Sequence, residues 1–205
     1  MIIPLFPLES GLFPDGIISL KIFEVRYLKM VKKAIDNGDT FGVVMLKSGS
    51  ETRKPGVNEV LMEVGTTAEI IESNTLQPSL MLIRCLGKEK FKLTEYKKGK
   101  YGLWTGKIKK LQIEPVEQIP ESLSFAANAL GKIISSMQKN GIPFDKMPIY
   151  PPFRLDDPGW VANRWTELLN LQVDCKQNLL EETCPIARLE KVAGFLSTSG
   201  KKFEC

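Results

Sequence analysis

The sequence predicts an α+β fold, in which a β-rich lobe with one embedded helix spans residues 1–117 and a helical bundle spans residues 120–197. Apolar residues in the first half alternate with polar ones or form short runs, as strands require. In the second half they recur every three or four positions, which is the spacing of one helical face. The stretch EPVEQIPES between the halves has the prolines and acids of a hinge. Residues 198–205 are expected to be a flexible tail.

The chain begins with two LFP steps, at residues 5–7 and 12–14. Proline fixes φ, lacks a backbone donor and biases the preceding residue towards extended geometry. We therefore expect short extended pieces that meet at a bend, and no helix in this segment.

Three elements are predicted after this bend. Residues 17–23 have the apolar and β-branched composition of a strand. A helix follows, because Val25, Leu28 and Ile35 recur at helical steps and Gly38 stands where a C-cap glycine belongs. Residues 41–46 form a short apolar run that indicates a buried strand.

The rest of the first lobe is predicted to be strand. Strand character resumes in residues 64–71 and continues through residues 80–96, with a turn or bulge at Gly87. A further strand is predicted from Tyr101 to Ile113.

The second half is predicted to be helical throughout. Residues 123–137 carry a clear apolar stripe at helical spacing. Asp157 and Pro158 stand where the N-cap and the first position of another helix are expected. Two further helical patterns cover residues 175–182 and 185–196.

Composition excludes several classes of function. The net charge of +4, from 28 basic and 24 acidic residues, is mild for a dedicated nucleic-acid binder. There is no histidine, which excludes Ser-His-Asp and Cys-His catalysis and His-ligated metals, whereas carboxylate, Lys, Tyr and Cys chemistry stays open. No cofactor motif and no convincing set of metal ligands is found, so we expect no metal and no cofactor. No apolar stretch approaches the roughly 20 residues that a membrane span needs. The four cysteines lack a CxxC pair, which favours a reduced, cytoplasmic chain.

Three stretches together resemble the N-terminal domain of ATP-dependent Lon proteases, and more closely the small stand-alone proteins built from it. They are IPLFPLESGLFPDGIISLKIFEVRYLKMV, VGTTAEII and LLEETCPIARLEKVAGFL. The resemblance extends from Met1 to about Ser197 and implies a PUA-like β-barrel lobe followed by the helical bundle. It also implies that the LFP steps are structural, with Phe6 and Phe13 packed against Leu20 and the start of the first helix.

Lon proteases continue into an AAA+ ATPase and a serine protease domain with a Ser-Lys dyad. This sequence has no G-x-x-x-x-G-K-[ST] motif, because the strings at residues 102–107 and 194–201 have the wrong spacing for a phosphate loop. The resemblance therefore implies a non-catalytic protein- or peptide-binding module that recognises unfolded or extended segments of other proteins. A separate ATPase or protease is a further expected partner.

The proline-rich connector KMPIYPPFRL, residues 146–155, is the segment expected to bind a partner. Rigid aromatic side chains dominate recognition energy, and prolines lower the cost of ordering the loop that holds them. Its anchor residues are predicted to be Ile149, Tyr150 and Phe153, with Trp160 just beyond it. The alternative is that the aromatics pack between the two lobes and hold them together.

Lysine-rich strands offer an alternative function, RNA binding. Lysines neutralise phosphates and interleaved aromatics stack bases. In KEKFKL the lysines are expected on one strand face, with Phe91 and Leu93 on the other. The run lacks arginine, and such lysines are also typical of a solvated face. The residues concerned are Lys88, Lys90, Lys92, Lys107 and Lys109.

Glu24 and Arg26, in IFEVRY, form the last pair of interest. They lie two residues apart in what is expected to be a first helical turn, so they should not share a face. Glu24 is therefore expected to stabilise the helix N-terminus, and Arg26 to pair elsewhere in the lobe.

Overall fold

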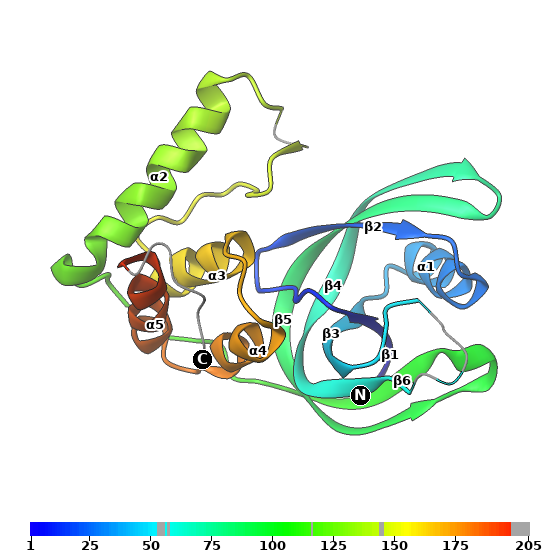
Figure 1. The fold of residues 1–205 in the computed structure, drawn as a ribbon. Coiled ribbons are helices and arrows are strands. Elements are labelled where there is room, and N and C mark those ends of the chain that lie inside the picture. The colour runs from blue at the N-terminus through cyan, green and yellow to red at the C-terminus, as the bar shows by residue number, and fades with distance from the viewer. Residues whose placement is uncertain (53–55, 57, 116, 144–145, 198–205) are drawn as a thin grey trace. The chain divides into compact units, whose positions relative to one another are not determined.

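A computed structural model describes residues 1–52, 56, 58–115, 117–143 and 146–197 (Figure 1). The chain forms two compact units, Met1–Gln112 and Ile113–Cys205. Among the described residues, the first unit holds a six-stranded sheet and one α-helix, and the second holds four α-helices, which confirms the α+β class. The predicted tail, residues 198–205, lies outside the described residues. Within the described residues, no helix is both long enough and apolar enough to span a bilayer.

The first unit is a β-barrel. Its sheet has the order β2-β5-β4-β3-β1-β6, and an additional pairing of β5 with β6 closes it. β1 and β3 are parallel, and the other pairs are antiparallel. Its elements are β1 Ile2–Leu8, β2 Ile17–Ile22, α1 Val25–Asn37, β3 Phe41–Ser48, β4 Val60–Gln77, β5 Leu80–Lys98 and β6 Trp104–Lys110 (Figure 1).

Strand β5 is shared between two neighbours on one side. β2 pairs with its first part, from Met81 to Leu86, and β6 pairs with its second part, from Phe91 to Lys98. The strand runs through Gly87 without a turn, and the register with β4 shifts beside it, so the predicted irregularity is a bulge. A Cβ at Gly87 would lie 2.1 Å from the carbonyl oxygen of Phe13, so only glycine allows this approach.

The LFP steps are structural, as the resemblance implies. Phe6 is buried and its ring stacks on Tyr27 of α1 at a centroid distance of 4.2 Å. Phe13 is fully buried, and the bend that follows it is hydrogen-bonded to β5, where Gly87 N–H donates to Gly16 O at 2.8 Å. Both phenylalanines therefore fix the bend between β1 and β2 against the barrel.

Helix α1 begins after Glu24, whose backbone is extended, and ends at Gly38 in the left-handed region with φ of 67°. The Gly38 N–H donates to Ala34 O, which confirms the predicted C-cap. The predicted apolar stripe is correct only in part. Leu28 is buried, whereas Val25 is 65% exposed and Ile35 is 40% exposed.

The second unit contains α2 Ser124–Lys139, α3 Pro158–Leu168, α4 Val173–Glu181 and α5 Pro185–Ser197. Asp157 caps α3, since its Oδ1 accepts from Trp160 N–H at 3.0 Å, and Pro158 occupies the first turn as predicted.

Cys85 of the barrel and Cys184 are free, whereas Cys175 is disulfide-bonded, so the expectation of reduced cysteines is wrong at Cys175.

A fully buried arginine, Arg188 of α5, organises the core of this unit. Its Nε donates to Leu179 O at 2.9 Å, and its Nη1 donates to Glu114 Oε2 at 2.9 Å and to Asn163 Oδ1 at 3.2 Å. Its Nη2 donates to Glu114 Oε1 and to Glu182 O. The buried guanidinium is thus paired and hydrogen-bonded, as burial of a charge requires.

Gly65 of β4 provides a test of barrel packing. A Cβ there would lie 2.3 Å from Val43 O and 2.8 Å from Phe91 Cζ, so Gly65→Ala should lower the free energy of unfolding by about 1–3 kcal/mol. Gly194 of α5 has nothing within 4 Å of the same added atom, so Gly194→Ala should raise it by about 0.5–1 kcal/mol. Urea denaturation followed by circular dichroism measures both, and an unchanged Gly65→Ala variant would contradict the packing described.

Candidate functional site

The connector residues lie partly inside the core of the helical unit. Ile149 and Trp160 are buried there, at 1% and 2% exposed. Phe153 is half-buried and meets Trp160 edge-on at a centroid distance of 6.5 Å, and Tyr150 is half-buried. Ile149 and Trp160 therefore serve the core, and a partner reaches only Tyr150 and Phe153 without unfolding it.

The lysine-rich strands carry matching glutamates. Lys88 pairs with Glu69 at 3.1 Å, and Lys92 pairs with Glu63 at 3.2 Å. On the next strand pair, Lys107 Nζ lies 3.3 Å from Glu95 and Lys110 pairs with Glu89. The surface is thus of mixed sign, because Glu63 and Glu69 of β4 and Glu89 and Glu95 of β5 pair with its lysines.

Two further lysines of this run lie in different environments. Lys90 is only 7% exposed, so the expectation that it shares an exposed face with its neighbours is wrong. The reason is the register shift between β4 and β5 near Thr66, which breaks the two-residue alternation. Lys109 of β6 is exposed.

A pocket of about 650 Å³ in the barrel unit joins the start of α1 to the turn between β5 and β6. Three of its apolar side chains are exposed, Phe23 by 52%, Val25 by 65% and Tyr101 by 70%. Its other lining residues are Glu24, Arg26, Lys29, Met30, Lys33 and Leu103. We call it the α1 pocket.

Arg26 fixes the two sides of the α1 pocket. Its Nη1 donates to Gly102 O at 2.6 Å and its Nε donates to Glu24 Oε2 at 3.0 Å. The expectation that Arg26 pairs elsewhere in the lobe is confirmed by its bond to Gly102. The expectation that it shares no face with Glu24 is wrong, because Glu24 precedes the helix in extended geometry and helical spacing does not apply to it. Arg26 is 6% exposed and its guanidinium lies 4.4 Å from the Tyr27 ring centroid, so the group is held in place.

Tyr101 was expected at the start of a strand, but it lies in a turn and β6 begins at Trp104. Its φ of 71° is left-handed, a region that costs a non-glycine residue roughly 1–2 kcal/mol. The turn is closed by hydrogen bonds from Gly102 N–H to Gly99 O and from Gly99 N–H to Leu103 O. These bonds hold an exposed tyrosine in a strained conformation.

A cluster of charged and polar side chains around Glu59 joins the ends of β5 and β6 that flank this turn. Glu59 accepts from Trp104 Nε1 at 2.6 Å and pairs with Lys98 Nζ at 2.7 Å, and its side chain is 5% exposed. Burial raises the pKa of Glu59, but the hydrogen bonds from Lys98 and Trp104 outweigh it and bring the pKa below its usual value.

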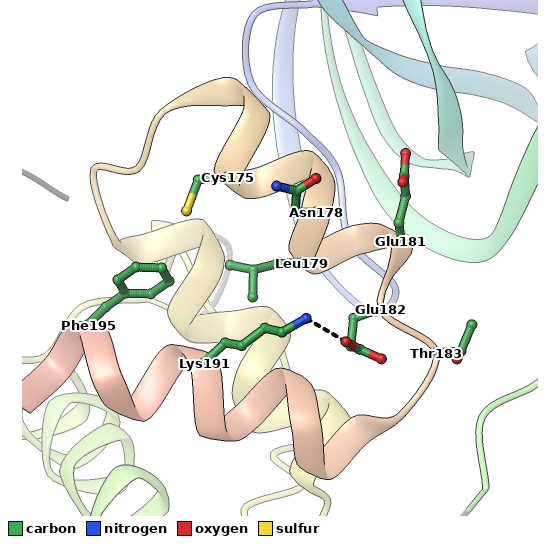
Figure 2. A pocket seen from close by; sticks show the side chains of 8 residues that line it. All are labelled: Cys175, Asn178, Leu179, Glu181, Glu182, Thr183, Lys191 and Phe195. Atoms are coloured by element: carbon green, nitrogen blue, oxygen red, sulfur yellow. Dashed lines mark hydrogen bonds and ion pairs between the residues drawn. The ribbon is translucent and has the colours of Figure 1, made fainter. Parts of the chain in front are cut away.

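A second pocket, of about 540 Å³, lies in the helical unit between α4 and α5 (Figure 2). Figure 2 shows Lys191 pointing towards Glu182, and the two are 2.5 Å apart. The hydrogen bond from Lys191 lowers the pKa of Glu182. The charges of Lys191 and Glu182 in this pocket are therefore neutralised by each other. Within the described residues, no group of three or more Cys, Asp or Glu side chains is placed to hold a metal ion.

Sequence reasoning missed the residues of the α1 pocket. Val25 was assigned to the buried stripe of the helix, and Tyr101 to a strand. A signal was present, since Phe23 and Val25 flank Glu24, the residue expected at the helix N-terminus, where a side chain is not yet bound to the core-facing stripe. The contact with Tyr101 has no local signal, because it depends on how the barrel closes.

A family model for the "ATP-dependent protease La (LON) substrate-binding domain" matches residues 2–198. The chain is 22% identical over 200 residues to a Lon protease of Dictyoglomus thermophilum, covering 96% of this chain and 24% of the relative. It is 23% identical over 203 residues to Lon protease 2 of Myxococcus xanthus, covering 96% and 23%. The chain thus spans about a quarter of the length of the curated relatives it matches.

Two solved structures share the fold. The Lon N-terminal domain protein from Xanthomonas campestris superposes with a TM-score of 0.73 at 25% identity, covering 95% of this chain and 98% of that chain. The N-terminal domain of a Mycobacterium avium complex Lon protease gives a TM-score of 0.62 at 12% identity, covering 97% and 100%. The barrel-plus-helices architecture expected from the sequence is therefore that of Lon N-terminal domains.

Replacing Tyr101 by glycine tests the strain in the turn. Tyr101→Gly relieves the left-handed penalty but gives the unfolded chain more freedom, so the free energy of unfolding should stay constant or rise by up to about 1 kcal/mol. Asp15→Gly, at φ of 60° in another bend of the barrel, is the matched control. Thermal and urea unfolding measure both. A clear loss of stability in Tyr101→Gly alone would mean that the tyrosine holds the turn.

The Glu59 cluster predicts a pH dependence of stability. Because the folded state lowers the pKa of Glu59 below its ordinary value of 4.5, the stabilisation is present above that value and is lost as pH falls through the lowered pKa. Glu59→Gln should therefore be less stable than wild type at neutral pH, and the difference should shrink in acid. Glu63→Gln, which removes an exposed partner of Lys92, should show a much smaller effect at every pH. Urea midpoints across the acid range decide this.

Proposed function

Because the chain belongs to the family of Lon substrate-binding domains, we propose that it is a non-catalytic module that binds exposed apolar or extended segments of other proteins. The observation that carries the proposal is the α1 pocket, where Phe23, Val25 and Tyr101 are more than half exposed around one hollow. Clustered exposed apolar side chains of this kind mark interaction sites.

The α1 pocket is suited to binding because its walls are fixed before a ligand arrives. Arg26 ties the helix start to the turn at Gly102, and Glu59 holds the strand ends that lead to that turn. A preformed site pays less ordering entropy on binding, so more of the apolar contact energy appears as affinity. Each side chain covered by a ligand contributes about 25 cal/mol per Å² of apolar surface removed from water.

Main-chain pairing supports recognition of extended segments. Within the described residues, β2 pairs with β5 alone, which leaves its other edge available to an added strand. β2 ends at Ile22, directly before Phe23 of the α1 pocket. An extended segment paired along β2 would reach the pocket, gaining backbone hydrogen bonds from the edge and side-chain contacts from the hollow.

A fluorescently labelled protein that is reduced and alkylated, and so cannot refold, tests the proposal by fluorescence anisotropy. Phe23→Ser/Val25→Ser should weaken its binding about tenfold, which corresponds to roughly 1.4 kcal/mol of lost apolar contact. Ile35→Ser is the matched control, because Ile35 is an exposed apolar residue of the same helix outside the pocket. Absence of binding by wild type, or equal binding by all three proteins, would reject the α1 pocket as the site.

The connector is tested in the same assay. Tyr150→Ala/Phe153→Ala removes the two connector aromatics that are only half-buried, and circular dichroism shows whether the helical unit stays folded. A folded variant with weakened binding would make the connector a second contact, and unchanged binding would exclude it.

The RNA alternative is separated by salt. Phosphate binding weakens steeply as salt rises, whereas contact between apolar groups does not. The ion pairs of Lys88, Lys92 and Lys107 with glutamates give no support to RNA binding. A single-stranded RNA bound at low salt and released at moderate salt would favour it over the peptide proposal.

A further inference from the structure

We infer that the α1 pocket selects segments in which a side-chain carboxylate lies beside an apolar residue. The inference rests on the proposed function and names the class of segment that the pocket prefers. It rests on the charges of the residues that line the pocket, which are net positive.

Two lysines line the pocket together with its apolar side chains. Lys29 and Lys33 follow Val25 at four-residue steps along α1, so the three side chains share one helix face. Both lysines are exposed, and within the described part of the chain neither forms an ion pair. Glu24, the acid that lines the pocket, is paired with Arg26 at 3.0 Å. The pocket therefore presents two positive charges without an opposing one.

Three lysines of the predicted RNA-binding surface differ from these two. Lys88, Lys92 and Lys107 each lie within 3.3 Å of a glutamate oxygen, so their charges are balanced by the protein itself. An uncompensated pair of cations beside exposed apolar side chains is complementary to an acidic and apolar ligand. It repels a segment that carries lysine or arginine at the same place.

Lys29 and Tyr101 place the two contacts next to each other. The Lys29 ammonium lies 5.4 Å from the centroid of the Tyr101 ring, within cation–π distance. An apolar side chain that packs on Tyr101 thus brings a neighbouring carboxylate to the ammonium. Residues held in sparsely populated backbone regions are enriched at ligand-binding sites, and Tyr101, with a left-handed φ and 70% exposed, is such a residue at the edge of the pocket.

Matched peptides test the inference. Each is acetylated and amidated so that only side chains carry charge, and each has the same apolar residues with Glu, Gln or Lys at the flanking positions. Two exposed ion pairs should give the Glu peptide an affinity about five- to tenfold higher than that of the Gln peptide at low salt. The advantage should shrink at high salt, and the Lys peptide should bind weakest.

Lys29→Gln/Lys33→Gln should abolish the preference while leaving the affinity for the Gln peptide nearly unchanged. Lys32→Gln/Lys47→Gln is the matched control, since it removes the same charge from exposed positions of α1 and β3 that do not line the pocket. It should keep the preference.

Three outcomes would overturn the inference: equal binding of the Glu and Gln peptides, loss of the preference in the control variant as well, or no peptide binding while the unfolded protein still binds. Each leaves the proposed function standing. Failure of the unfolded protein to bind as well would reject the proposed function itself.

Discussion

The barrel depends on the double use of strand β5. One side of this 19-residue strand pairs with β4, while the other pairs first with β2 and then with β6. The second pairing closes the sheet, so the strand that leads into α1 and the turn that follows β5 belong to one body. Arg26 and Gly102, 76 positions apart in sequence, are hydrogen-bonded as a result. The α1 pocket exists because of that closure.

Glycines and buried charges make the closure specific. At Gly65 and Gly87, a backbone carbonyl oxygen of a neighbouring segment lies so close that a Cβ atom would clash with it. The absence of a Cβ therefore lets the strands and the bend after Phe13 pack at close range. Glu59 and Arg26 each have hydrogen-bond partners at the same hairpin. Glu59 binds Trp104 and Lys98, and Arg26 binds the backbone carbonyl of Gly102 in the turn. Buried charges with complete partners fix geometry, and here they fix the hairpin that carries Tyr101.

The sequence predicted features whose cause is local. The Gly38 cap, the Asp157 and Pro158 helix start and the bend after the LFP steps follow from backbone preferences, and the structure confirms them. Features that depend on distant partners were missed. The strand run predicted from Tyr101 contains a turn because β5 needs a reversal before β6, and Lys90 is buried because a bulge shifts the register. Ile149 looked like a surface anchor because a proline-rich segment gives no sign of which face packs inwards.

Charge in the sequence and charge in space differ in this protein, and the difference decides where a ligand is attracted. The densest lysine run lies on strands whose glutamates pair with several of its lysines, so part of its positive field is cancelled at short range. Lys29 and Lys33 belong to a less conspicuous run, yet they stand beside exposed apolar surface with no acid of the barrel paired to them among the described residues. The lysine charges attract an acidic ligand to the α1 pocket, and the exposed apolar side chains of the pocket can then bind it. This combination gives a selectivity that apolar contact alone lacks. Apolar surface binds any hydrophobic segment, whereas the lysines add a preference for segments that carry negative charge.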